Sequence, residues 1–268
     1  MEIAIYNLIL VCSSVVYLMF SNETNPDGPV YGGIYSIEFR QDSVGIVAVE
    51  SNNWVAFGSG RPKASYFVLN RHNWKPQKTT QKKFEARFPN ARVFDSDDND
   101  PYRWQSSPNP IALNDSRSNR FEFERTDCVD GDGGEKVCHK LNLSFDDKKG
   151  ALPLAGSCES GCEPAAVETW GQQIWVGLYH MGDLAPTGEG LHVFERGNLN
   201  RVFHVQTTSP GMIPNLIRKD PSANLMWVGS NMGLRAYDGE FRTVGDCQVQ
   251  VSTKKHGLYL KCRPAALP

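Results

Sequence analysis

The sequence of 268 residues lacks the short motifs that mark the common catalytic and nucleotide-binding sites. It has no Gly-x-Ser-x-Gly elbow, no His-Glu-x-x-His zinc helix, no Walker loop and no dinucleotide fingerprint. It also has little net charge, −2 at pH 7, which argues against nucleic acid as the main partner. Helical periodicity is absent outside the N-terminal segment, whereas glycine and proline are plentiful, so we expect an all-β fold with many turns.

A short pattern occurs twice in the C-terminal half of the chain. The first copy joins Ile174–Gly177 to Gly190–Gly197, and the second joins Met226–Gly229 to Gly233–Gly239. In each copy an apolar strand ends in Trp-Val-Gly, and a second strand with alternating apolar residues follows after a turn. This arrangement predicts a β-hairpin.

The glycines and tryptophans of the two copies carry further expectations. We expect Gly177 and Gly229 to lie where the chain leaves the strand, because glycine permits positive φ there. We expect Trp175 and Trp227 to bury large flat surfaces between neighbouring sheets.

The segment Asn224–Asp238 resembles the repeat of two-component-regulator propellers, whose pattern is roughly n-l-W-v-G-t-x-x-G-l-x-x-y-d. The resemblance covers about residues 165–242, and a degraded copy lies upstream at Asn53–Gly58. It implies a β-propeller-like fold built from blades of roughly 40–45 residues. It also implies a sensor domain outside the membrane, and it implies no catalytic residue.

The rest of the chain suggests a leader followed by one domain. Residues 1–24 contain an almost continuous apolar run and predict a signal peptide or a membrane anchor. Residues 25–268 are expected to form the propeller-like domain, with a loop-rich stretch outside the repeat at about 75–165. Because that stretch leaves little room for blades, we expect a propeller that is small, degenerate or incomplete.

Six cysteines outside the leader fall into three local pairs. These predict the disulfides Cys128–Cys138, Cys158–Cys162 and Cys247–Cys262, and hence a secreted or otherwise extracytoplasmic location. A zinc site is the alternative, although the spacings match no common zinc motif. Glycosylation sequons at Asn22, Asn114 and Asn142 are consistent with a surface location.

Two acidic segments are candidates for calcium, the only cofactor that the sequence suggests, because alternating carboxylates supply hard oxygen ligands. A solvated turn is the alternative for each of them. The candidate ligands are Asp95, Asp97, Asp98, Asp100, Asp130, Asp132 and Glu135.

The insertion between the two strands of the first copy is the strongest candidate for a ligand-binding or catalytic site, because insertions in repeats map to loops on one face. Such side chains could bind a metal or transfer protons. The candidates are Tyr179, His180, Asp183, Glu189 and His192.

The sequence therefore favours an exported or membrane-anchored, propeller-like protein that binds or senses a protein, a glycan or a small molecule. In this interpretation it contacts the membrane only through its N-terminal segment. Two alternatives remain open: a hydrolase or lyase with a pocket near residues 178–192, and a structural surface protein without a small ligand.

Overall fold

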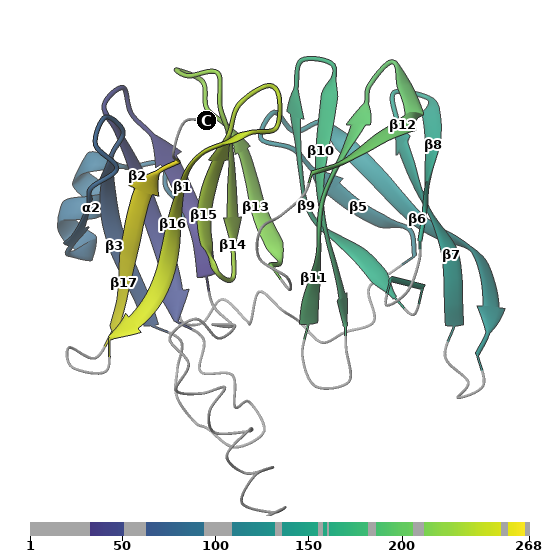
Figure 1. Cartoon of the computed structure of the whole chain (residues 1–268), viewed down its shortest axis with the longest axis horizontal. Coiled ribbons are helices and arrows are strands. Elements are labelled where there is room, and N and C mark those ends of the chain that lie inside the picture. Colours follow the sequence, from purple (N-terminus) through teal and green to yellow (C-terminus); the bar gives the residue numbers. More distant parts are fainter. Residues whose placement is uncertain are drawn as a thin grey trace, which may run out of the picture.

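A computed structural model describes residues 33–50, 63–93, 109–131, 136–154, 158–159, 161–181, 186–205, 212–252 and 257–265. These residues fold into four antiparallel sheets, each built from strands that are consecutive in the chain (Figure 1). The prediction of an all-β fold is confirmed.

Each sheet is an up-and-down meander in which the strands are paired in chain order. The first sheet contains β1 (Gly33–Phe39), β2 (Ser43–Glu50), β3 (Lys63–Asn70) and β4 (Pro76–Thr79). The second contains β5 (Ile111–Asn114), β6 (Arg120–Asp130), β7 (Lys136–Phe145) and β8 (Lys148–Pro153). The third contains β9 (Cys162–Trp170), β10 (Gln173–Met181), β11 (Pro186–Glu195) and β12 (Asn198–Val205). The fourth contains β13 (Pro214–Lys219), β14 (Met226–Ser230), β15 (Gly233–Tyr237), β16 (Thr243–Ser252) and β17 (Gly257–Pro264).

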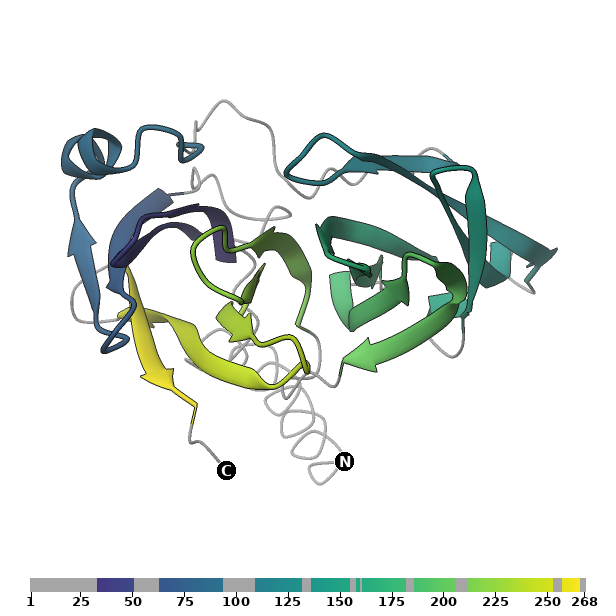
Figure 2. The same ribbon diagram turned by 90° about the horizontal axis from the view of Figure 1, so that it is seen from above.

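The four sheets lie side by side in the order second, third, fourth, first, as the view from above shows (Figure 2). The first strands of the four sheets lie next to one another along a shared axis: β5 contacts β9, β9 contacts β13, and β13 contacts β1. In a propeller, the innermost strands of successive blades are arranged around a central axis. Each sheet here therefore resembles one blade. The described strands form no closed barrel.

Apolar side chains fill the spaces between neighbouring sheets. One buried cluster joins the second and third sheets, another joins the third and fourth, and a third joins the fourth and first. A separate cluster covers the other face of the first sheet, where the short helix α2 (Gln81–Arg87) packs through Phe84. Because both faces of each inner sheet are covered, the strands depend on their neighbours for burial.

The two copies of the repeat form equivalent hairpins, as predicted. Gly177 on β10 is opposite Leu191 on β11, and Gly229 on β14 is opposite Leu234 on β15. Trp175 and Trp227 are 0% and 1% exposed, and each lies in a cluster shared by two sheets. The expected burial of the tryptophans between sheets is confirmed.

The prediction that Gly177 and Gly229 lie at strand ends and provide a positive φ is wrong. Gly177 and Gly229 lie within β10 and β14, and neither has a positive φ. A Cβ atom on Gly177 would clash with the carbonyl oxygen of Pro214, at the start of β13. A Cβ atom on Gly229 would lie 2.8 Å from the Cβ atom of Ile34 on β1. Each glycine thus admits the first strand of the neighbouring sheet at close range.

The stretch at about 75–165, which we expected to be loop-rich, contains β4, α2 and the whole second sheet. Its strands escaped prediction because they lack the tryptophan repeat, although some, such as Arg120–Asp130, alternate exposed and buried residues at their start. Residues 1–24 and the degraded copy at Asn53–Gly58 lie outside the described residues. Within the described ranges, no helix is long and apolar enough to cross a membrane.

All three predicted disulfides are present. Cys128 and Cys138 face each other across β6 and β7, and Cys247 and Cys262 do so across β16 and β17. The prediction of a disulfide-stapled fold is confirmed, and such bonds are typical of proteins that fold in an oxidising, extracytoplasmic compartment.

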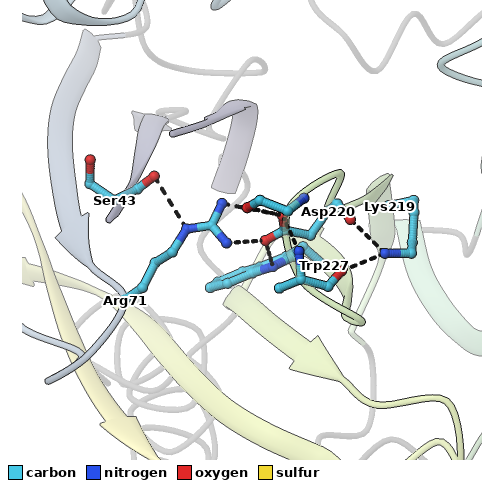
Figure 3. Close-up of polar contacts among 7 residues, drawn as sticks. Ser43, Arg71, Lys219, Asp220 and Trp227 are labelled. Carbon is cyan, nitrogen blue, oxygen red and sulfur yellow. Dashed lines mark hydrogen bonds and ion pairs between the residues drawn. The ribbon is translucent and has the colours of Figure 1, made fainter. Parts of the chain in front are cut away.

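A buried ion pair joins the first and fourth sheets (Figure 3). The guanidinium of Arg71, just after β3, donates to both carboxylate oxygens of Asp220, which follows β13 and whose side chain is 0% exposed. The same carboxylate accepts a hydrogen bond of 3.2 Å from the indole N–H of Trp227. A buried carboxylate held by a bidentate arginine and an indole has the partners that such a charge requires.

The close approach at Gly177 leads to a test of sheet packing. We expect Gly177→Ala to lower the free energy of unfolding by about 1–3 kcal/mol, because the new methyl group must displace the backbone of β13. Gly197→Ala, in the turn after β11, is the matched control, since its nearest neighbour is a flexible glutamate oxygen 4.0 Å away. Urea unfolding of both variants measures the difference; equal midpoints would contradict the proposed role of Gly177.

Candidate functional site

The structure places the described candidates of the insertion in three pairs of neighbouring residues. His180 Nδ1 lies 2.6 Å from Glu189 Oε1, so this histidine and this acid are adjacent. The hydroxyl of Tyr179 donates instead to Glu163 on β9, at 2.9 Å. Asp183 lies outside the described residues.

His192 lies opposite His204 on the neighbouring strand β12, with their ring centroids 4.9 Å apart. Burial of the imidazole, together with the charge of His204, lowers the pKa of His192 from 6.5 to about 4. His192 is therefore neutral at physiological pH. Sequence reasoning missed His204, because only the register of β11 and β12 brings it beside His192.

The calcium candidates remain predictions. Asp130 is an exposed residue at the end of β6, and Asp95, Asp97, Asp98, Asp100, Asp132 and Glu135 lie outside the described residues. Within the described part of the chain, no three His, Cys, Asp or Glu residues are close enough together to hold a metal ion.

A second group of charged residues lies where the C-terminal ends of β5, β9 and β13 meet. We call it the junction cluster; it comprises Asp115, Arg117, Glu168, Arg218 and Lys219. The ends of these first strands come together because the strands line the same axis of the molecule. In propeller-like folds, the loops at such an end form one face that is open to ligands.

Glu168 is the most unusual member of the junction cluster, because it is a carboxylic acid that is 0% exposed. Its Oε1 accepts a hydrogen bond of 3.0 Å from the backbone N–H of Thr169, whereas Oε2 has no hydrogen-bond partner among the described residues. Burial raises the pKa of Glu168 above its ordinary value of 4.5, although the nearby Ser116 hydroxyl and the charge of Arg218 oppose the rise. A buried polar atom without a partner costs free energy and requires an explanation.

Asp115 differs from Glu168 because its carboxylate is fully engaged. It accepts hydrogen bonds from the Thr169 hydroxyl at 2.6 Å and from the Asn119 side-chain amide at 2.8 Å. It also accepts bonds from the backbone N–H groups of Arg117 and Asn119, both at 2.9 Å. Although burial opposes ionisation, these hydrogen bonds lower the pKa of Asp115 below its ordinary value. Asp115 therefore fixes the turn between β5 and β6 against β9.

The cations of the junction cluster differ in how firmly they are held. Lys219 donates to the carbonyl oxygens of Asp220 and Ala223, and its Nζ lies 5.1 Å from the ring centroid of Trp170. Burial of Lys219 lowers its pKa; the charge of Asp220 opposes this shift, and the charge of Arg117 adds to it. Arg117 itself is exposed and belongs to the turn after β5. An exposed guanidinium next to buried charged groups is available to an incoming ligand.

Sequence reasoning missed the junction cluster because its members come from three distant segments. The only local signal is a glutamate within the apolar strand segment Ala165–Trp170. On a strand with one solvent-exposed face, such a glutamate is expected to face solvent. Glu168 is buried because neighbouring sheets cover both faces of the third sheet.

Comparisons with known proteins assign no family. No protein-family model and no curated protein matches the chain. Among solved structures, the chain is similar to the extracellular domain of BT4673 from B. thetaiotaomicron, described as a one-component system, with a TM-score of 0.33 and 13% identity over 77% of this chain and 28% of that chain. A second structure of that domain, described as part of a hybrid two-component system, has a TM-score of 0.31 and 13% identity over 76% and 27% of the two chains. The chain thus spans less than a third of these proteins, and at such scores the likeness assigns neither a fold nor a function.

The raised pKa of Glu168 leads to a test of its burial in the native state. Because the folded-state pKa is raised, the unfolded chain loses this proton first as the pH increases, so the contribution of Glu168 to stability falls between its ordinary pKa of 4.5 and its folded pKa. We expect Glu168→Gln to gain stability relative to the unsubstituted protein as the pH rises from about 4 to 8. Urea unfolding across this pH range measures the difference; a constant difference would show that the acid is not buried.

Proposed function

We propose that this chain is an extracytoplasmic binding or sensing domain whose ligand contacts the junction cluster. The observation that carries the proposal is Glu168, a fully buried acid with one carboxyl oxygen that lacks a partner among the described residues. Stability alone does not account for such a group, since an apolar residue or an amide with partners would cost less. Groups of this kind are concentrated at functional sites.

The charges around Glu168 define the class of ligand. A carboxyl oxygen without a partner among the described residues, such as Oε2 of Glu168, can accept a hydrogen bond from a donor such as a hydroxyl group. Arg117 is exposed, and Nη1 of Arg218 donates a hydrogen bond of 2.8 Å to the carbonyl oxygen of its neighbour Ile217. The charge of Arg218 acts on Glu168, and the exposed Arg117 belongs to the same cluster next to Lys219. Guanidinium groups favour a carboxylate or another acidic group on the ligand. The ligand is therefore a small hydroxylated acid.

The contacts in the insertion favour binding over the alternative of a hydrolase or lyase. A catalytic site there would require His180 and His192 to act on one reacting atom. In the structure His180 is adjacent to Glu189, whereas His192 is adjacent to His204. Both histidines lie near Glu189, but their imidazole rings have different side-chain neighbours.

The three disulfides support an extracytoplasmic location for the domain. Residues 1–24 would then serve as the signal peptide or membrane anchor that delivers it. Sensing, as distinct from simple binding, requires such an anchor, because a ligand outside the membrane must influence a partner on the other side.

Binding of simple hydroxylated acids tests this proposal. We expect glucuronate and gluconate to bind the full chain in isothermal titration calorimetry, and glucose, which lacks the acidic group, to bind at least about tenfold more weakly. Arg117→Ala is expected to weaken glucuronate binding at least about tenfold, because it removes an ionic hydrogen-bonding partner.

Arg120→Ala is the matched control, since Arg120 is an exposed arginine at the start of β6 that pairs with Glu122. It should leave binding unchanged. Equal binding of glucose and glucuronate, or absence of binding by all three compounds, would overturn the proposed ligand class. Loss of binding in both arginine variants would point to general electrostatics in place of a defined site.

A further inference from the structure

Two histidines on the third sheet are placed so that both could bind one metal ion. His192 on β11 and His204 on β12 are directly opposite each other in an antiparallel ladder. Side chains at opposite positions share one face of the sheet, with Cβ atoms roughly 4.5–5.5 Å apart. His204 is exposed and His192 is half-buried, so the pair is accessible from solvent.

The distance between the two rings suits a shared metal ion. Two imidazoles bound to one tetrahedral ion, each at a metal–nitrogen distance of about 2.0–2.1 Å, have ring centres roughly 5 Å apart. The centroids of His192 and His204 are 4.9 Å apart, with an angle of 59° between the ring planes. The exposed His204 is the ring that would rotate to direct a nitrogen at an ion shared with His192.

The surroundings of His192 also fit this role. Its imidazole forms a hydrogen bond with the backbone of Glu189, where only the carbonyl oxygen can accept its N–H. Histidines that bind metals usually donate their second ring nitrogen to a carbonyl or carboxylate, which fixes the orientation of the ring. On the same sheet face, the neighbouring pair Phe194 and Val202 packs against the core shared with the second sheet, so the two strands are held rigidly.

We propose that His192 and His204 form a binding site for a divalent ion of the late transition series, Cu²⁺ or Zn²⁺. Imidazole nitrogen suits these ions, and Cu²⁺ stands highest in the general order of affinities. The two histidines supply two ligands, and water completes the coordination, since the described residues contain no cluster of three metal-binding side chains. The site is separate from the junction cluster and independent of the ligand proposed for it.

Metal titration of the full chain, purified without a polyhistidine tag, tests this assignment. We expect Zn²⁺ to bind in isothermal titration calorimetry, and His192→Gln and His204→Gln each to weaken this binding about 10–100-fold. With one equivalent of Cu²⁺, electron paramagnetic resonance should show splitting from two nitrogen ligands, and from one fewer in His204→Gln.

His72→Gln is the matched control, because His72 is an exposed histidine in the turn between β3 and β4. It should bind both ions as the unsubstituted protein does. His204→Gln keeps the assignment testable even if the half-buried His192 cannot be replaced without loss of folding, which circular dichroism and urea unfolding monitor. Unchanged affinity in His204→Gln, or absence of binding to the unsubstituted protein, would overturn the proposal.

Discussion

The architecture depends on the close contact between the first strand of one sheet and the sheet beside it. At two of the three junctions between sheets, β13 and β1 lie so close to their neighbours that a glycine must occupy the facing position. The glycines concerned are Gly177 and Gly229, the final residues of the two Trp-Val-Gly segments. The repeated residues are therefore those that the packing between sheets requires. The tryptophans two residues before each glycine fill the volume beside each contact.

Polar contacts link the sheets where the first strands end. At two of the three junctions, the contact is made by an aspartate that directly follows the first strand. Asp115 follows β5 and Asp220 follows β13; each accepts backbone N–H groups from its own turn and one side chain from the next sheet. That side chain is Thr169 in one case and Arg71 in the other. The remaining junction uses the ammonium of Lys219 against the ring of Trp170. One face of the molecule thus concentrates buried charge, while apolar clusters fill the space between the strands.

Local patterns were enough to predict the hairpins of the repeat, the burial of Trp175 and Trp227, and the three disulfides. Each depends on residues that are near one another in the sequence, such as Cys247 and Cys262. The second sheet was not predicted, because its strands lack the tryptophan pattern. Glu168 and His204 were not predicted as site residues either. Their surroundings depend on strand register and on contacts between sheets that are distant in the sequence. Such contacts cannot be predicted from the local spacing of residues.

The disulfide between Cys247 and Cys262 determines how the C-terminal end responds to mechanical load. It links β17 to β16, while β17 also contacts β2 and β4 of the first sheet. A force applied at the C-terminus therefore reaches β16 through a covalent bond, and it cannot peel β17 away by breaking hydrogen bonds one after another. Under oxidising conditions, the residues between Cys247 and Cys262 therefore bear none of a load that is applied beyond Cys262.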